Sequence, residues 1–362
     1  MGGNALKNCV TRRYPAQEYY PLEASVLMRL KEAFPNKRIV PIKAYRNKET
    51  FGDMDILLES PIPEVDLRDA LTALFEPKEL VSEGYLHGLR TPNGQLRHRD
   101  SIGLVDAIPE FNETGCISFE HHEFQVDVLC TPTRYFDFCS HYYDYNDLGN
   151  LCGVLAKSLG VTLGFDGLWL KVKEGTRYFG KVLLTSDYDE ALVFLGYDVA
   201  RYHQGFDAID DMFDFVQANP HFNGELYTLA NRNNRSRTRD VKRTTYIAFL
   251  ARLSTTVQQG SPGQIAQEEL LSRIYDAFPH ARAQYEALLA TKGQKSHARQ
   301  LFSGATFKAL TGLEGKALGL LMADLRKPFL TNDAFLQFIA EVSMPRLREL
   351  TMESKARLGL KP

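Results

Sequence analysis

Apolar and polar positions follow two different periods along the first third of the chain, and these predict its helices and strands. Apolar residues three or four positions apart indicate amphipathic helices, whereas short apolar runs bounded by turn residues indicate strands. Residues 84–100 contain Pro92-Asn93-Gly94 and several basic side chains, which is typical of an exposed loop. The predicted helices are residues 21–34 and 65–75, and the predicted strands are residues 39–42, 101–109 and 116–130.

The rest of the chain has a mostly helical pattern. Residues 133–159 return to helical spacing, and short strands are predicted at 161–172 and 181–184. Beyond Phe206 almost every apolar position has helical spacing, and the clearest interruption is the Gly- and Pro-containing segment 259–263. We therefore expect an α+β fold, in which a mixed β-sheet with helices on one face is followed by an all-helical C-terminal part.

One predicted strand carries acidic side chains at positions where an apolar residue would be ordinary. In the segment Gly52-Asp53-Met54-Asp55-Ile56, alternate side chains point to the same face of a strand. Asp53 and Asp55 should therefore project together, while Met54 and Ile56 pack behind them. Because a glycine precedes the acids and apolar strand residues follow them, the carboxylates of Asp53 and Asp55 are expected at the beginning of a strand.

A third acid, Asp127 in Val126-Asp127-Val128, also lies on a predicted buried strand, and Asp106 is its rival for the third position. Pairing of the two strands would bring three carboxylates to one point, where they repel one another unless cations lie between them. By contrast, Asp187-Tyr188-Asp189 precedes a helical pattern, which indicates a helix N-cap and first turn. The sequence thus predicts a metal site at Asp53, Asp55 and Asp127.

Composition places few further limits on the partners. With 362 residues the chain can form two or three packed domains, and its net charge of −2 means that any contact with nucleic acid must come from local basic patches. The five cysteines show no Cys-x-x-Cys pairing and are expected to be reduced and mostly buried. We find no signal-peptide pattern and no apolar run long enough for a membrane span, so a cytoplasmic protein without a membrane partner is expected.

The acidic motif, together with Val126-Asp127-Val128, resembles the palm of the DNA polymerase β superfamily of nucleotidyltransferases. The stretch His141-Tyr142-Tyr143-Asp144-Tyr145, the segment 156–160 and the segment 189–197 are similar to the closing subdomain of family X polymerases, so that the resemblance covers roughly residues 20–200. It implies a palm domain at 1–132, a thumb-like closing subdomain at 133–204 and a helical domain at 205–362.

This resemblance also implies two Mg²⁺ ions, with Mn²⁺ as a possible substitute, held by Asp53, Asp55 and Asp127 while an NTP or dNTP is the substrate. Gly52 would permit close approach of the phosphates. Family members usually place a Gly-Ser pair before the first two acids, whereas this chain has Ile42-Lys43-Ala44-Tyr45-Arg46-Asn47-Lys48. The expected nucleotide-binding residues are therefore Gly52, Lys43, Arg46, Lys48 and, at the sugar, Tyr142 and Tyr143.

A basic run at 231–243 holds six basic residues and one acid, which predicts contact with nucleic-acid phosphates. The alternative is a solvated helix face paired with Asp210, Asp211 and Asp214. Phe302-Ser303-Gly304 and the segment 310–319 are similar to the helical tail of CCA-adding tRNA nucleotidyltransferases, whose Gly-Gly-x-Val-Arg-Asp motif is absent. The predicted nucleic-acid-binding residues are Arg232, Arg235, Arg237, Arg239, Lys242 and Arg243.

These expectations combine into one main hypothesis and three rivals. The main hypothesis is a Mg²⁺-dependent transfer of a nucleotide from an NTP to a nucleic-acid 3′ hydroxyl, with an RNA or tRNA-like acceptor favoured over DNA. The rivals are a reduced family X-like DNA polymerase, a nucleotidyltransferase acting on a protein or small molecule, and a nucleic-acid-binding module on an inactive palm. The acids at all three positions count against the last of these.

Overall fold

The fold was obtained as a computed structural model, which describes residues 5–83, 115–175, 177–254, 266–290, 298, 300–329 and 332–360. The predicted loop at 84–100, the predicted strand at 101–109 with Asp106, and the break at 259–263 lie outside the described residues. The chain divides into two compact units. The first consists of residues 1–86, 109–170 and 183–281, and the second of residues 87–108, 171–182 and 282–362. The predicted domain boundaries after residues 132 and 204 differ from these divisions and remain predictions.

A mixed sheet forms the centre of the first unit, as the sequence predicted, and it has five strands among the described residues. Its strand order is β2-β4-β7-β6-β5, in which β4 and β7 are parallel and the other neighbours are antiparallel. β1 and β3 pair with each other in a separate, short antiparallel ribbon. The strands are β1 (Tyr14–Pro15), β2 (Ile39–Pro41), β3 (Thr50–Phe51), β4 (Asp53–Ser60), β5 (Leu80–Glu83), β6 (Gly115–His121) and β7 (Phe124–Pro132).

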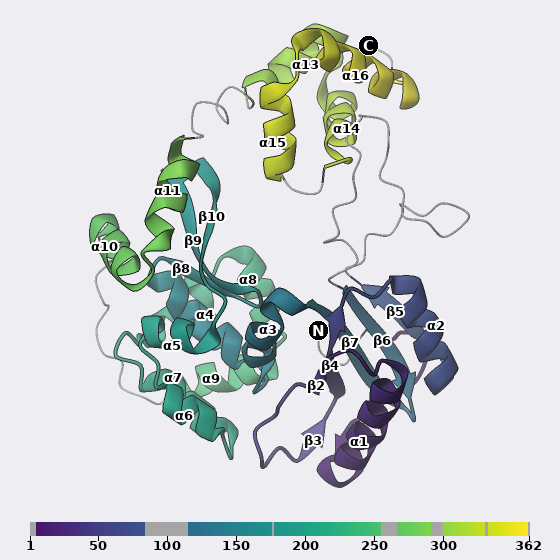
Figure 1. Cartoon of the computed structure of the whole chain (residues 1–362), viewed down its shortest axis with the longest axis vertical. Helices are drawn as coiled ribbons and strands as arrows, with labels where there is room; N and C mark the ends of the chain where they lie inside the picture. The colour runs from purple at the N-terminus through teal and green to yellow at the C-terminus, as the bar shows by residue number, and fades with distance from the viewer. Residues whose placement is uncertain are drawn as a thin grey trace. The chain divides into compact units, whose positions relative to one another are not determined.

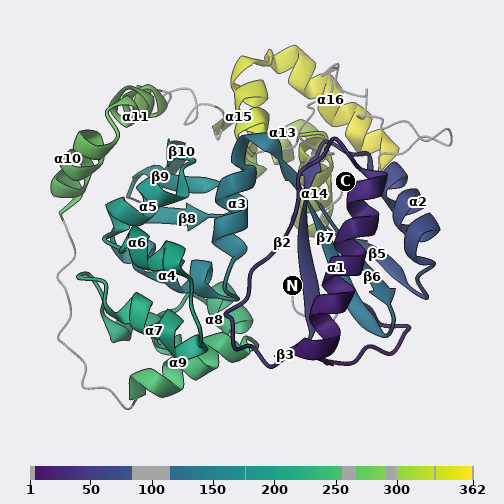
Figure 2. The same cartoon turned by 60° about the horizontal axis from the view of Figure 1, so that its bottom comes forward.

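Alternation along β4 and β7 gives the sheet one apolar face. Met54, Ile56 and Val126 are fully buried in a core that also includes one side of α1 (Ala16–Ala33) and of α2 (Glu64–Phe75). Figures 1 and 2 show both helices covering this face of the sheet. Because side chains two apart share a face, the alternate positions of β4 and β7 are directed to the opposite side.

On that opposite side the sheet packs against α3 (Phe136–Tyr143), where Leu57, Leu129 and Phe136 form a small apolar cluster. A three-stranded sheet of order β10-β9-β8 follows α4. Its strands are β8 (Val161–Gly164), β9 (Gly167–Glu174) and β10 (Arg177–Thr185). The helices that complete this unit are α4 (Leu148–Ser158), α5 (Tyr188–Leu195), α6 (Val199–Gln204), α7 (Ile209–Gln217), α8 (Asn234–Asp240), α9 (Thr244–Ser254) and α10 (Gln267–Ala277).

The C-terminal part is helical, as predicted. Helix α11 spans His280–Ala290, and a separate apolar core built around Phe307, Leu321 and Phe335 holds the last four helices together. These helices are α13 (Gly304–Thr311), α14 (Gly315–Arg326), α15 (Asn332–Glu341) and α16 (Met344–Arg357). The division into compact units assigns this helical core to the second unit.

Three smaller expectations can be compared with the structure. Asp187 is the N-cap of α5, where its side chain accepts a hydrogen bond from the Glu190 amide. The second Asp-x-Asp motif, at 187–189, therefore begins a helix, as predicted. All five cysteines are free thiols and all but Cys9 are buried. Among the described residues, every helix is too short or too polar to cross a bilayer.

Helix α4 provides a test of the packing against α3. A Cβ atom at Gly149 would lie 2.2 Å from the carbonyl oxygen of Tyr142. We expect Gly149→Ala to lower the free energy of unfolding by about 1–3 kcal/mol, as overpacking does, although alanine favours a helix. Chemical denaturation measures this change.

Gly153, one turn further along α4, is the matched control. Its nearest neighbour would be 3.7 Å from an added Cβ, which is an ordinary contact. Gly153→Ala should therefore raise the free energy of unfolding by about 0.5–1 kcal/mol through helix propensity alone. Equal effects of the two substitutions would contradict the proposed packing.

Candidate metal centre

The parallel pairing of β4 with β7 brings the three predicted acids together. Asp55 lies directly opposite Asp127 in the register, and Asp53 is two residues earlier on the same face of β4. One oxygen from each carboxylate lies within 4.8 Å of the other two. The side chain of Asp127 is fully buried, whereas Asp53 and Asp55 are half-buried. The sequence prediction of this cluster is therefore matched by the geometry.

Two carboxylates of this cluster, those of Asp55 and Asp127, are costly to ionise in the folded chain. Burial raises the pKa of Asp55 well above its usual value, and the charges of Asp53 and Asp127 raise it further. Burial also raises the pKa of Asp127 to about 6, with the charge of Asp53 adding to this and a hydrogen bond from Ser118 opposing it. A carboxylate that is costly to ionise gains most from a nearby positive charge.

The donor set fits a hard divalent cation. Oδ1 of Asp55 is buried and has no hydrogen-bond partner among the described residues. A buried acceptor without a partner costs free energy, which a coordinated cation would recover. Carboxylate oxygens are the ligands that Mg²⁺ and Mn²⁺ prefer. Asp53, Asp55 and Asp127 could thus hold a metal ion, and Mg²⁺ is compatible with them.

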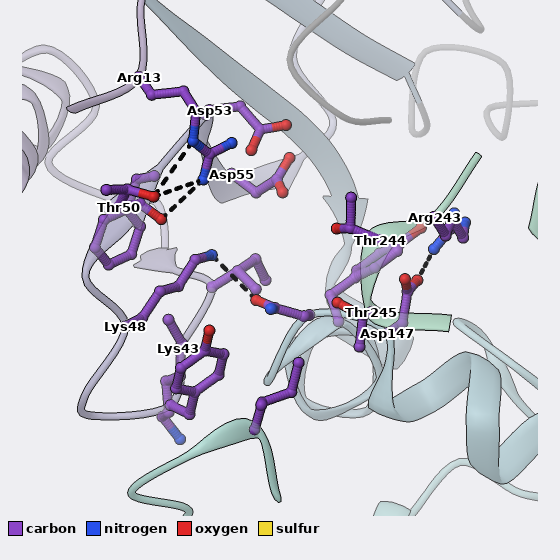
Figure 3. A pocket seen from close by; sticks show the side chains of 18 of the residues that line it. Arg13, Lys43, Lys48, Thr50, Asp53, Asp55, Asp147, Arg243, Thr244 and Thr245 are labelled. Carbon is purple, nitrogen blue, oxygen red and sulfur yellow. Dashed lines mark hydrogen bonds and ion pairs between the residues drawn. The ribbon is translucent and has the colours of Figure 1, made fainter. Parts of the chain in front are cut away.

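A polar pocket opens in front of Asp53 and Asp55, and Figure 3 shows both carboxylates directed into it. Lys48 lies on the same wall. Its amino group donates to Oδ1 of Asn146 at 3.1 Å and lies 4.6 Å from the centre of the Phe51 ring. Burial lowers the pKa of Lys48, and the charges of Asp53 and Asp55 partly oppose this. Lys48 therefore places positive charge beside the acids.

The other two cations predicted for this loop have partners elsewhere. Nζ of Lys43 lies 3.3 Å from Oδ2 of Asp144, a fully buried side chain that also accepts from the Lys43 amide. Lys43 contributes to the pocket wall. Arg46, which is not among the residues that line the pocket, pairs with Asp207 and donates to the carbonyl of Gln204. The ion pairs of Lys43 and Arg46 anchor the loop. Of the three cations on this loop, Lys48 therefore fits the predicted role in nucleotide binding best.

Gly52 is next to a guanidinium that the sequence analysis did not include. Nη1 of Arg13 lies 2.8 Å from the position that a Cβ of residue 52 would occupy. Arg13 is held there by Thr50, because its Nη2 donates to the carbonyl and to Oγ1 of that residue at 3.0 Å. Figure 3 shows this contact beside Asp53 and Asp55. Gly52 therefore makes room for Arg13, which lines the same pocket.

Aromatic side chains form another part of the wall. Tyr142 and Tyr143 both line the pocket and are half-buried. Phe165, at the turn between β8 and β9, stacks on Tyr143 with a ring separation of 6.4 Å and is 40% exposed. Phe165 also lines the pocket and was missed at the sequence level, where the turn offered no signal for it.

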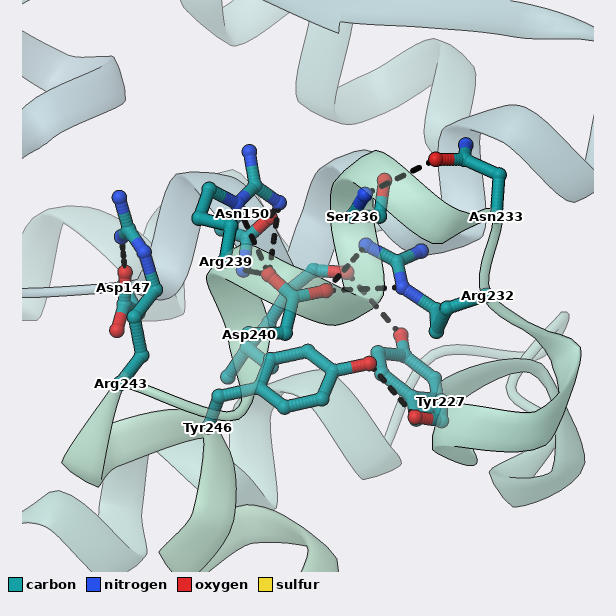
Figure 4. A network of polar contacts seen from close by, with 11 residues as sticks. Asp147, Asn150, Tyr227, Arg232, Asn233, Ser236, Arg239, Asp240, Arg243 and Tyr246 are labelled. Carbon is teal, nitrogen blue, oxygen red and sulfur yellow. Dashed lines mark hydrogen bonds and ion pairs between the residues drawn. The ribbon is translucent and has the colours of Figure 1, made fainter.

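The basic run separates into residues with different roles. Arg232 is buried and pairs with the fully buried Asp240, which Arg239 contacts from the other side (Figure 4). Arg243 pairs with Asp147. These partners differ from the predicted Asp210 and Asp214, which pair with Arg252.

Three members of this run, Arg239, Lys242 and Arg243, line the same pocket as Asp53 and Asp55. Arg237 is exposed, is not among the lining residues and donates to Asn234. The side chain of Arg235 lies outside the described residues. The structure thus brings half of the predicted phosphate-binding residues to the candidate site.

No protein-family model and no curated protein matches this chain. The function must therefore be argued from the arrangement of the residues themselves.

The pKa of Asp127 leads to a pH-dependent stability. Because its pKa is about 6 in the folded chain and near 3.8 when unfolded, the folded state binds more protons between these values. Without divalent ions, the contribution of Asp127 to the free energy of unfolding should fall as pH rises through this window and stay low above it. We expect the free energy of unfolding of Asp127→Asn, relative to that of the unchanged chain, to be higher at pH 8 than at pH 4. Chemical denaturation in the presence of a chelator measures this difference.

Added Mn²⁺ should reverse this difference at pH 8, because the unchanged chain would gain the binding free energy and Asp127→Asn would gain less. Asp187→Asn, in the other Asp-x-Asp motif, is the control because Asn also caps a helix, and it should show no such pH dependence. Identical pH profiles for Asp127→Asn and the unchanged chain would show that burial and the charge of Asp53 do not raise the pKa of Asp127 in the folded chain.

Proposed function

We propose that this chain is a divalent-cation-dependent nucleotidyltransferase, which transfers a nucleotide from an NTP to the 3′ hydroxyl of a nucleic acid. The observation that carries the proposal is the convergence of the carboxylates of Asp53, Asp55 and Asp127, of which Asp53 and Asp55 line a pocket whose walls also hold cations. Three carboxylates would serve a cation site, and the basic side chains would serve a phosphate-bearing substrate. This combination favours phosphoryl chemistry over a purely structural metal site.

The roles of the side chains follow from their positions. Asp53, Asp55 and Asp127 would hold the divalent ions. When bound, such ions lower the pKa of an attacking hydroxyl and stabilise the charge of a leaving pyrophosphate. Lys48 and Arg13, on the wall beside Asp53, would attract the triphosphate, for which Arg offers a fork of N–H donors and Lys a compact charge.

Basic side chains on the same pocket support a nucleic-acid acceptor. Arg239, Lys242 and Arg243 come from the end of α8 and the turn before α9, and they line the pocket together with Asp53 and Asp55. Phosphates bound there would place a strand end within the pocket that contains the candidate metal centre. The preference for RNA or tRNA-like ends rests on the C-terminal resemblance, and the helical C-terminal part remains a proposed contributor to acceptor binding.

The first test is release of pyrophosphate. Purified protein with Mg²⁺ or Mn²⁺, labelled NTPs or dNTPs, and single-stranded, duplex or tRNA acceptors should release pyrophosphate and extend at least one acceptor. Asp55→Asn should reduce the rate by at least about 100-fold, because it removes a cation ligand at the reacting centre.

Asp187→Asn is the matched control for this assay, since Asn also caps a helix and the Asp-x-Asp motif at 187–189 begins α5. It should keep nearly full activity. Labelled product on a protein or small molecule, with every nucleic acid unextended, would replace the proposed acceptor. Failure of every combination of metal, nucleotide and acceptor to release pyrophosphate would overturn the proposal.

Salt dependence tests the acceptor surface. Each phosphate contact made by a basic side chain adds about 1 to the slope of log Kd against log salt concentration. Lys242 is exposed and lines the pocket. We expect Lys242→Gln to weaken binding of a single-stranded oligonucleotide and to reduce the slope by about 1, measured by fluorescence anisotropy.

Arg237→Gln is the control, because Arg237 belongs to the same basic run but does not line the pocket. It should change the slope by much less than Lys242→Gln. A larger effect at Arg237 than at Lys242 would place the acceptor on the outer surface of α8 rather than in the pocket.

A further inference from the structure

Asp127 is contacted by a side chain that carries no charge and has no place in the proposed chemistry. Gln125 lies two residues earlier on β7, so both side chains are on one face of the strand. Its Nε2 donates to Oδ1 of Asp127 at 2.9 Å and to Oδ2 at 3.0 Å. Gln125 is only 1% exposed, so solvent cannot replace these bonds easily.

The orientation of the Gln125 amide is fixed from the opposite side. A glutamine can present either its NH₂ group or its oxygen to a neighbour, and only the NH₂ group is compatible with a carboxylate. The backbone N–H of Ala5 donates to Oε1 of Gln125 at 3.1 Å. This bond selects the orientation in which Nε2 faces Asp127.

The position of Ala5 is fixed by the residues that follow it, because Glu79 binds residues 7–9. The carboxylate of Glu79 accepts hydrogen bonds from the amides of Lys7, Asn8 and Cys9 at 2.9, 2.7 and 3.1 Å, and from the Asn8 side chain at 2.9 Å. Leu6, between Ala5 and these contacts, is buried. Hydrogen bonds to a charged acceptor are roughly twice as strong as neutral ones, so Glu79 anchors residues 5–9 firmly.

We infer that Gln125 is a positioning residue for the divalent cation, and that Glu79, through residues 5–9, holds Gln125 in the required orientation. This inference rests on the cation site of the proposed function but does not need the proposed reaction. An amide directs the Asp127 carboxylate without neutralising it, and after the bonds from Gln125 and Ser118 one of the roughly four lone-pair sites of the carboxylate is left for a metal ion. A cationic partner in the same place would compete with the divalent ion.

Direct measurement of Mn²⁺ binding tests this inference separately from catalysis. Gln125→Met keeps the length of the side chain and removes the donor. We expect it to weaken Mn²⁺ binding by about 10–100-fold, the usual effect of losing an outer-shell partner, as measured by electron paramagnetic resonance of free Mn²⁺. Gln217→Met, on α7, is the matched control and should leave Mn²⁺ affinity unchanged. Thermal unfolding in a chelator checks that both variants fold.

Glu79→Gln perturbs the anchor from a half-buried position and keeps the inference testable if Gln125→Met does not fold. It should weaken Mn²⁺ binding several-fold, whereas Glu76→Gln nearby should not. In the background of Gln125→Met, Glu79→Gln should have little further effect, because both act on Asp127 through one amide. Non-additive losses of this kind support the coupling.

Several outcomes would overturn the inference. These are unchanged Mn²⁺ affinity in folded Gln125→Met, additive effects of the two substitutions, or no Mn²⁺ binding by the unchanged chain at millimolar concentration. Gln125→Met could lose Mn²⁺ affinity while the unchanged chain releases no pyrophosphate. That result would support the inference and overturn the proposed function. The two proposals can therefore fail independently.

Discussion

Repulsion among three carboxylates on one face of a parallel strand pair is the constraint on which the rest of the site depends. The register of β4 and β7 sets Asp55 opposite Asp127. This register is fixed by the other face, where Met54 and Val126 are fully buried, because a slip of one residue would exchange the buried and the acidic faces. The apolar core behind the sheet therefore stabilises an arrangement of charges that would not form by itself.

The basic residues around the pocket are divided between holding the fold and facing the site. Asp144, Asp147 and Asp240 are buried acids, and each binds cations that the sequence alone would assign to phosphates. Removing one partner of such a pair leaves an uncompensated buried charge, so these contacts fix positions more than they add stability. Asp240 is the clearest case, since it links Arg232, Arg239 and, through its bond from Asn150, helix α4.

The acids could be predicted from sequence because their signal is local. Alternation within a single strand was enough to place Asp53 with Asp55, and Asp127 had the same local signature on the partner strand. The pairing of Arg46 with Asp207 and of Lys43 with Asp144 joins segments more than 100 residues apart, and no local pattern encodes such contacts. The helices and strands could be predicted from their apolar periods because these periods are also local patterns.

Three residues near the acids were not predicted from the sequence, and they differ in whether a local pattern could have revealed them. Gln125 could have been found, because the alternation that places Asp127 on its face of β7 places Gln125 there as well. Its orienting partner Ala5 could not, since the bond between them spans 120 residues. Arg13 was hidden for the same reason, and its contact with Gly52 shows that a glycine beside an acidic motif can serve a neighbouring side chain as well as a ligand.

The distribution of neutral and charged partners around the acids is consistent with a site that must remain anionic. Asp127 accepts hydrogen bonds from Gln125 and from Ser118, neither of which carries charge. The amino group of Lys48 contributes positive charge beside Asp53 and Asp55, and its hydrogen bond goes to the neutral side chain of Asn146. Because neutral donors orient a carboxylate without satisfying its charge, the free energy of binding a divalent cation is kept available. A site stabilised fully by its own lysines and arginines would fold more easily but would bind the cation less strongly.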